Sequence, residues 1–350
     1  MASLLERLRG RTRYERNTRE NWDLRPDVAG YEYADEGVNW RIGVLRNVVE
    51  SAEDFDAIKA ILETPFTPQV TRNMARAVLT RKTIEHLPPA LEKLLPDVEA
   101  VISLGGSGNP KLEDCYQVIF ARNDASRQTP KDVMEREQAA AQRAFKEGKD
   151  MRSSGGLHPL PPDTHLERIT TNSDREFLAS CYDLANADFT TSPEEFDELL
   201  DDGSTIMMAA IKEESGQKTV VGFLYAWKDT DVLYRKRKKV ELNMYEMMGG
   251  EVKGDTPGHD VSRALSERVL HELAQRKDAE AVFTHSNAES PAAFSVAAQT
   301  GSTLATTVAR ELGIPIRPLQ KATKTDGVWV DEIASYMGRK KLIELYGTAA

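Results

Sequence analysis

Apolar residues in the first 150 positions recur with two spacings, one helical and one typical of strands. After a helix start at Ser51, apolar side chains recur three or four residues apart as far as Leu62, which predicts an amphipathic helix. Two short apolar runs, 98–104 and 116–121, predict strands. A further helix is predicted over 130–149, where alanines and charged residues replace large apolar ones. We expect that helix to pack weakly or against a partner.

From residue 173 onward the pattern predicts helices, then an antiparallel hairpin, then strands alternating with helices. Two apolar runs joined by a polar turn at Ser215-Gly216 indicate the hairpin. In chain order, the predicted elements are helices at 173–187 and from 192, strands at 205–211, 219–227 and 240–248, a loop at 249–259, a helix over 261–273, a strand at 281–284, a helix at 290–300, and strands at 302–310 and 328–337.

One stretch rich in Ser, Gly and Pro, residues 151–164, separates these two patterns and predicts a linker. We therefore expect a basic N-terminal arm at 1–24, an N-terminal domain at 25–150 and a C-terminal domain at 165–350. The expected fold class is α+β, with a mixed central sheet flanked by helices in the C-terminal domain. A separate α/β domain with an Arg-rich arm is expected to precede it.

The composition excludes several classes of protein. Hydrophobic residues make up 40% of the 350 residues and charged residues 29%, which is typical of a globular protein. No apolar run approaches the roughly 20 residues that a membrane-spanning helix needs, and the Arg-rich start is unlike a secretory signal, so we expect a cytoplasmic protein. Two cysteines provide neither a disulfide framework nor a four-cysteine zinc site, and no metal is expected.

The net charge of −10 argues against general binding of nucleic acid, so any anion site must be local. Two interpretations fit the Arg-rich arm at 1–24: it contacts RNA or a neighbouring subunit, or it is a solvated helix or tail. The basic run 235–239 lies in a turn and binds phosphates or RNA, or is a solvated hairpin tip. The acidic helix 194–202 recruits a cationic amine or a basic arm of another copy, or is a solvated helix face.

A glycine-rich turn at 105–111 follows the strand predicted at 98–104. Bare backbone amides after a strand can bind an anion, which would suit a nucleotide-handling enzyme. The turn lacks the Gly-Lys-Ser/Thr ending of a P-loop, since Pro110-Lys111-Leu112 stands there. A tight loop joining two strands is the better interpretation.

The order of elements from Leu166 to Arg339 resembles that of the GNAT superfamily of acyltransferases. The resemblance implies acetyl-CoA as cofactor, with its pyrophosphate bound by the amides that open the helix after the loop. Free N–H groups and the positive end of the helix dipole coincide there. The implied cofactor-binding residues are Gly258, His259, Asp260, Val261, Ser262 and, at the end of the next strand, Asn287.

Two residues of the loop depart from the family's pattern. Pro257 stands where an arginine is usual, and Asp260 stands where the second glycine is usual. A carboxylate in a pyrophosphate site repels the ligand unless its side chain turns outward to cap the helix.

Acyl transfer to an amine needs a base that deprotonates the amine. At a strand period of two, Glu241 and Glu246 face opposite sides of the sheet. Glu246 is nearer the loop and is the candidate base, and Tyr245 is the other polar group at this point. Where related enzymes place a tyrosine as acid for the thiolate, this chain has an alanine, so Tyr336 or Ser290 is the candidate substitute.

These features favour an N-acyltransferase that moves an acetyl group from acetyl-CoA to an amine of a small molecule or a peptide. The alternative is a catalytically inactive acyltransferase-like fold that serves in binding or self-assembly, with homo-oligomers formed through the arm. A nucleotide-handling enzyme built on the turn at 105–111 is the third hypothesis.

Overall fold

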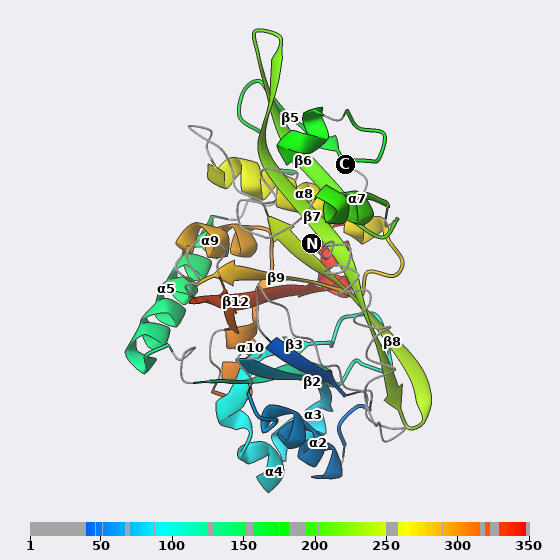
Figure 1. Cartoon of the computed structure of the whole chain (residues 1–350), viewed down its shortest axis with the longest axis vertical. Helices are drawn as coiled ribbons and strands as arrows, with labels where there is room; N and C mark the ends of the chain where they lie inside the picture. The colour runs from blue at the N-terminus through cyan, green and yellow to red at the C-terminus, as the bar shows by residue number, and fades with distance from the viewer. Residues whose placement is uncertain are drawn as a thin grey trace.

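Two β-sheets form the body of the protein, and helices cover their outer faces (Figure 1). The arm predicted at 1–24 lies outside the residues that the structure describes. In this computed structural model the described residues are 40–45, 47–50, 52–66, 71–86, 88–124, 129–151, 157–174, 176–181, 193–201, 203–249, 258–288, 290–315, 319–322 and 329–347.

The smaller sheet belongs to the N-terminal half and has the strand order β1-β2-β4-β3. Strand β1 is parallel to β2, and the other pairs are antiparallel. Its strands are β1 (Trp40–Val44), β2 (Arg72–Thr80), β3 (Val98–Ser103) and β4 (Cys115–Asn123), and the helices of this half are α2 (Ala52–Leu62), α3 (Arg81–Glu85), α4 (Pro89–Glu92), the 3-10 helix η1 (Leu95–Asp97) and α5 (Lys131–Asp150). The predicted helix after Ser51 and both predicted strands are confirmed.

The larger sheet belongs to the C-terminal half and has the order β10-β12-β9-β8-β7-β6-β5, with β11 paired to β12. All its pairs are antiparallel except β8 with β9. Its strands are β5 (Thr164–Arg168), β6 (Ile206–Glu214), β7 (Gln217–Arg235), β8 (Lys238–Gly249), β9 (Ala281–Asn287), β10 (Thr303–Leu304), β11 (Leu319–Ala322) and β12 (Trp329–Gly338).

The helices of the C-terminal half are α7 (Pro193–Asp201), α8 (Gly258–Gln275), α9 (Pro291–Gln299), α10 (Ala305–Glu311) and α11 (Arg339–Tyr346). On one face of the larger sheet, α8 and α11 share a hydrophobic cluster with the strands, which includes Val261 and Val282. On the opposite face, Phe196 of α7 packs on Phe223 of β7, with ring centroids 5.7 Å apart. No helix among the described residues is both long and apolar enough to span a membrane.

The two sheets share one hydrophobic cluster, to which β3 contributes Ile102 and the larger sheet contributes Leu242 and Phe283. Charged residues also bridge them: Arg76 of β2 lies 2.6 Å from Asp229 of β7. In Figure 1, α10 lies between the sheets. The smaller sheet therefore packs against the larger one, and the division into domains at 151–164 stays a prediction.

Helix α5 packs against α9 of the C-terminal half rather than remaining weakly packed. Ala141 and Phe145 of α5 are buried with Phe294 of α9 in one cluster. At Gly148 an added Cβ would lie 2.5 Å from the carbonyl oxygen of Ser295, so only a glycine permits this approach. The alanine-rich pattern of this helix is thus explained by close helix contact.

The strand predicted at 302–310 is wrong. Only Thr303–Leu304 is extended, and Ala305–Glu311 is the helix α10. The Thr and Val residues of this segment favoured a strand, but Ala305 and Ala309, four residues apart, are buried on one helix face. Of the predicted helix 173–187, the structure describes 176–181, which are helical, and 173–174, which are not.

Candidate functional site

The larger sheet opens between its two parallel strands. Strand β8 pairs with β9 only from Met244 to Glu246, opposite Ala281 to Phe283. Beyond this point β8 continues to Gly249 and β9 to Asn287 without pairing to each other. The strand ends thus leave an opening in the sheet at Glu246.

A histidine from one strand contacts a glutamate from the other at this opening. Nδ1 of His285 on β9 lies 3.3 Å from Oε1 of Glu246 on β8. Glu246 and Phe283 are register partners and share a face of the sheet, and His285, two residues further along β9, lies on the same face. Both side chains are largely buried, with 11% of His285 and 12% of Glu246 exposed.

The hydrogen-bond chemistry fixes the proton of the imidazole. An ionised carboxylate only accepts, so Nδ1 of His285 donates to Glu246. The Phe283 ring packs edge-on against the imidazole, with centroids 5.6 Å apart and an interplanar angle of 74°. Nδ1 is thus occupied, and in the neutral ring Nε2 carries the lone pair.

The pair lies between the helix-covered part of the sheet and the N-terminal sheet. On one side, Trp227 is the cross-strand neighbour of Glu246 and packs against the cluster that contains Phe196 of α7. On the other side, Ala334 is the cross-strand neighbour of His285 and packs with Ile119 of β4. The N-terminal half therefore forms one flank of this opening.

Tyr245, a predicted site residue, lies on the opposite face of β8 from Glu246. It is fully buried, and its hydroxyl lies 3.3 Å from Oδ2 of Asp278 and 3.2 Å from the guanidinium of Arg276. Burial raises the pKa of Tyr245. The structure thus places this hydroxyl in a polar cluster after the end of α8, away from the Glu246–His285 pair.

Tyr336, the predicted acid, is buried on β12 opposite Phe283. Burial raises its pKa to about 12, although hydrogen bonding to Ser103 of β3 acts in the other direction. Its side chain therefore takes part in the packing between the two sheets. Ser290, the other candidate acid, begins α9, and its backbone N–H donates to the carbonyl of Asn287 at 2.9 Å.

The predicted cofactor-binding residues from Gly258 to Ser262 form the start of helix α8. The helix begins at Gly258, so Gly258 and His259, which the sequence places in the loop 249–259, belong to its first turn. Val261 is fully buried against the sheet, and the carbonyl of Ser262 accepts a hydrogen bond from Ser266 at 2.8 Å. The preceding residues 250–257 lie outside the described part of the chain. Asn287 is the exposed last residue of β9.

The side chain of Asp260 is turned toward a residue of the predicted linker 151–164. Its Oδ1 lies 3.0 Å from Nε2 of His158. The backbone N–H of His158 also donates to the carboxylate of Glu267, further along α8. His158 is thereby held against α8 at two points, and Asp260 is paired with an imidazole.

The glycine-rich turn at 105–111 is a tight loop between β3 and β4, as predicted. The carbonyl of Gly106 accepts from the N–H of Lys340 at 2.7 Å, and the side chain of Asn109 donates to Glu280 at 3.1 Å. The turn is therefore docked against the C-terminal half by its backbone, which disfavours a phosphate site there.

The basic run 235–239 forms the tip of the β7–β8 hairpin. Arg235 makes two hydrogen bonds of 2.7 Å to the carboxylate of Asp114 in the N-terminal half. These bonds hold the pKa of Asp114 below its usual value. At Arg235, at least, the run has a structural role between the halves.

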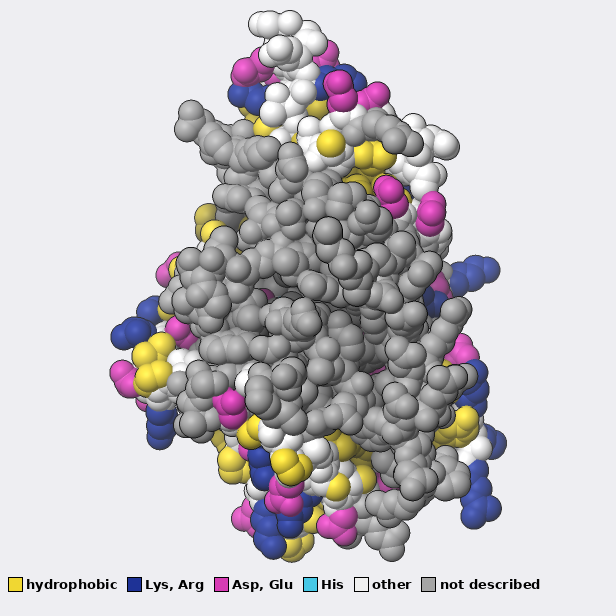
Figure 2. Space-filling model, viewed as in Figure 1, with side chains coloured by type: hydrophobic (Ala, Val, Ile, Leu, Met, Phe, Trp, Pro, Cys, Tyr) yellow, Lys and Arg dark blue, Asp and Glu magenta, His cyan; other side chains and the backbone are white. Residues whose placement is uncertain are grey.

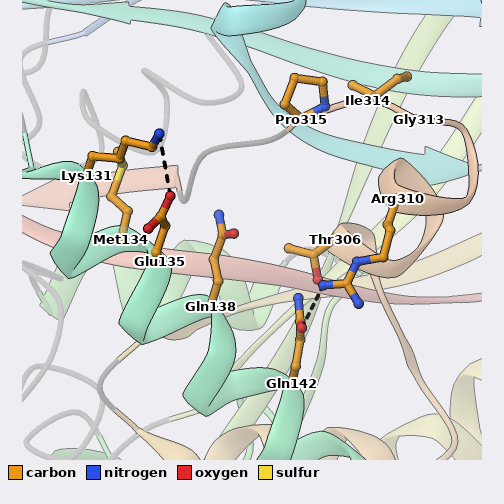
Figure 3. A pocket seen from close by; sticks show the side chains of 10 residues that line it. All are labelled: Lys131, Met134, Glu135, Gln138, Gln142, Thr306, Arg310, Gly313, Ile314 and Pro315. Atoms are coloured by element: carbon orange, nitrogen blue, oxygen red, sulfur yellow. Dashed lines mark hydrogen bonds and ion pairs between the residues drawn. The ribbon is translucent and has the colours of Figure 1, made fainter.

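No group of three or more His, Cys, Asp or Glu side chains in the described ranges is placed to hold a metal ion. A hollow of about 560 Å³ lies between α5 and α10 (Figure 3). There Arg310 donates to Gln142 at 2.7 Å, and Lys131 lies 3.6 Å from Glu135. None of the predicted site residues lines it. In the view of Figure 2, basic and acidic side chains are interspersed at the rim of the molecule.

Comparisons with known proteins find likeness only among solved structures. No protein family and no curated protein matches the sequence. NAA60 of Arabidopsis thaliana in complex with acetyl-CoA aligns with 50% of this chain and 98% of its own, at 14% identity and a TM-score of 0.38. Spermidine N-acetyltransferase of Vibrio cholerae in complex with CoA and spermine aligns with 52% and 99%, at 16% identity and a TM-score of 0.36.

The NatC complex bound to Gag peptide and CoA aligns with 50% of this chain and 98% of its own, at 16% identity and a TM-score of 0.37. These solved acetyltransferases thus match about half of the chain.

His285 is the residue that sequence reasoning missed. The histidine was visible in the run His285-Ser286-Asn287, but nothing in a single sequence fixes the register between β8 and β9. A parallel pairing that begins at Ala281 would have placed His285 on the face of Glu246, because side chains alternate with a period of two.

Proposed function

We propose that this protein is an N-acyltransferase that moves the acetyl group of acetyl-CoA to an amine of a small molecule or a peptide. The observation that carries the proposal is the opening between β8 and β9, at which the Glu246 carboxylate and the His285 imidazole meet. A base beside an opening between strands suits an amine that must lose a proton before it attacks a thioester.

Residues at the start of α8 suit the anionic end of acetyl-CoA. The first N–H groups of a helix have no partner within it, and the helix dipole favours negative charge there. The backbone N–H groups of Gly258, His259 and Asp260 would provide this site. Val261 and Ser262 follow them in the same turn, and Asn287 lies at the end of β9. The side chain of Asp260 is turned to His158, which reduces the repulsion that a carboxylate would otherwise exert.

The alternative, an inactive fold that serves in binding or assembly, is favoured by one observation. The Asp260 carboxylate is 44% exposed in the first turn of α8, where the related enzymes have a glycine. The two proposals differ in whether acetyl-CoA binds and turns over.

The test combines binding with turnover on the full chain. Calorimetric titration with acetyl-CoA is expected to give a saturable heat. Incubation with acetyl-CoA and a panel of primary amines is expected to release free thiol in step with an acetylated amine detected by mass spectrometry. The absence of both heat and thermal stabilisation at millimolar acetyl-CoA would sink the enzyme proposal and favour the alternative.

A matched pair of variants ties any turnover to the opening. Glu246→Gln removes the buried carboxylate, and Glu241→Gln removes an exposed one from the opposite face of the same strand. We expect Glu246→Gln to lower kcat by at least about tenfold, at the lower end of what general bases contribute, and Glu241→Gln to leave it unchanged. Equal rates for the two variants would place the chemistry elsewhere.

A further inference from the structure

We propose that His285, rather than Glu246, takes the proton from the acceptor amine, and that Glu246 is a positioning residue which orients the imidazole. This inference rests on the proposed function, since it concerns the base of that reaction. It reassigns the role that the sequence suggests for Glu246.

The hydrogen bond between His285 and Glu246 decides which nitrogen of the imidazole carries the proton. The carboxylate of Glu246 can only accept, so the proton of the neutral imidazole is on Nδ1. The lone pair is then on Nε2, for which the described part of the chain offers no hydrogen-bond partner. Nε2 is therefore the atom of this pair that remains available to an amine proton.

The groups around the His285 imidazole restrain it and face the charge that it gains. The edge-on contact with Phe283 and the bond to Glu246 restrain the imidazole on two sides. Because both side chains are nearly nine-tenths buried, the carboxylate charge acts at reduced dielectric and stabilises the imidazolium that proton transfer produces. The buried carboxylate thus holds the ring in place and faces the charge that forms on it.

Other charged groups on this face lie farther from the ring. Glu332 of β12 is two residues from Ala334, the cross-strand neighbour of His285. Asp229 of β7 is two residues from Trp227, the cross-strand neighbour of Glu246, and is paired with Arg76. Among the described residues, Glu246 is the only acidic side chain within hydrogen-bond distance of the imidazole.

The step balances with the groups named. Nε2 of His285 accepts the proton as the amine nitrogen forms its bond to the acetyl carbonyl carbon. When the carbon–sulfur bond breaks, its electron pair leaves with the sulfur, and the imidazolium returns the proton to the thiolate. The products are the acetylated amine and the free thiol, and His285 ends neutral. No oxidant, metal or further reactant is needed.

The experiment compares pH profiles of kcat for the full-length protein and four variants: His285→Gln, Glu246→Gln, Glu246→Asp and the control Glu241→Gln. His285→Gln is expected to lower kcat by roughly 100-fold or more, within the range for a general base, with little change in KM for acetyl-CoA. The acid limb of the profile, which protonation of the imidazole produces, is expected to disappear in that variant.

The Glu246 variants separate orientation from proton transfer. Glu246→Gln is expected to lower kcat but to keep an acid limb, because His285 still takes the proton while its ring has lost the carboxylate that orients it. Glu246→Asp is expected to restore part of the rate. Circular dichroism and thermal unfolding check folding. If His285→Gln fails to fold, rescue of His285→Ala by added imidazole provides the second measurement, and rescue is expected.

The outcomes distinguish this inference from the proposed function. Wild-type protein that binds no acetyl-CoA and acetylates no amine overturns both. Wild-type transfer with an unchanged acid limb in His285→Gln overturns the inference alone. Loss of the acid limb in Glu246→Gln, with the limb kept in His285→Gln, makes Glu246 the base and likewise overturns it. Failure of imidazole to rescue a folded His285→Ala counts against it too.

Discussion

Asp260 and His158 lie 3.0 Å apart across the first turn of α8, although 102 positions separate them in the chain. In the proposed function a carboxylate at this place would repel the pyrophosphate of acetyl-CoA, and the imidazole occupies its Oδ1. The backbone of His158 is fixed by Glu267 of the same helix, so the imidazole is held at Asp260 by the helix itself. Where the GNAT pattern has its second glycine, this chain thus has a carboxylate that is paired with a residue from outside α8.

Removal of that imidazole is expected to weaken acetyl-CoA binding through Asp260. We predict that His158→Ala raises the Kd of acetyl-CoA about fivefold, the effect of roughly 1 kcal/mol. Asp260→Asn should lower the Kd of acetyl-CoA. The double variant, which combines His158→Ala with Asp260→Asn, should have the same Kd as Asp260→Asn alone, because the two side chains are coupled. Calorimetry measures all four proteins. His165→Ala, which removes a half-exposed histidine of strand β5, is the control and should leave Kd unchanged.

Additive effects of His158→Ala and Asp260→Asn would contradict the prediction, since they would mean that the imidazole acts independently of the carboxylate. An unchanged Kd in His158→Ala would show that Asp260 already lies outside the reach of the ligand.

The alternation of side chains along β8 could be predicted from the sequence, and it placed Glu241 and Glu246 on opposite faces. Glu241 is more than half exposed and Glu246 is buried, as opposite faces require. The order of elements likewise predicted the hairpin, the third strand and the helix that follows the loop. These features depend on local periodicity, which a single sequence contains.

The remaining features depend on contacts between distant segments. Strand β2 carries Arg72 and Arg76, which pair with Glu99 and Asp229, so its pattern is not that of an ordinary strand. His285 joins the site only through the register of a parallel pair. Neither an ion pair between distant strands nor a strand register leaves a signal in one sequence.

The contact between α5 and α9 is expected to be sensitive to a single methyl group. We predict that Gly148→Ala destabilises the protein by about 1–3 kcal/mol, the usual cost of overpacking, because the new Cβ would lie 2.5 Å from the Ser295 carbonyl oxygen. Urea unfolding measures the change. Gly203→Ala is the control, since nothing lies within 4 Å of its added Cβ, and it should change stability little.

If Gly148→Ala unfolds at the same urea concentration as wild type, α5 does not pack on α9 as the structure has it. A decrease in the midpoint with an unchanged slope would support a local packing defect rather than a change in the unfolded state.

The bond between Asp114 and Arg235 is expected to make stability depend on pH. The hydrogen bond to Arg235 lowers the pKa of Asp114 in the folded protein. A lowered folded pKa stabilises the protein above the unfolded pKa, and the contribution is lost as the pH falls through the folded value. Since Asp114 is half exposed, solvent screening limits the contribution to about 0.5–1 kcal/mol.

We therefore predict that Asp114→Asn lowers the free energy of unfolding by that amount at pH 7. The difference from wild type should shrink as the pH falls below about 4, the ordinary pKa of aspartate. Thermal unfolding at a series of pH values measures both. Glu113→Gln, at the neighbouring acidic position, is the control and should follow the wild-type curve. A difference that stays constant down to the acid limit of the series would contradict the linkage.

Tyr336, the sequence-based candidate for the acid, gives the sharpest contrast with His285. Burial raises the pKa of Tyr336 to about 12, well above the roughly 8.5 of a thiol, so its hydroxyl is a poor proton donor to a thiolate. Its hydrogen bonding to Ser103 indicates a role in sheet packing instead. We predict that Tyr336→Phe lowers stability by about 1 kcal/mol, the usual value of a lost hydrogen bond, while kcat falls far less than in His285→Gln. Steady-state kinetics beside urea unfolding separate the two roles: a large fall in kcat with unchanged stability would return Tyr336 to the chemistry.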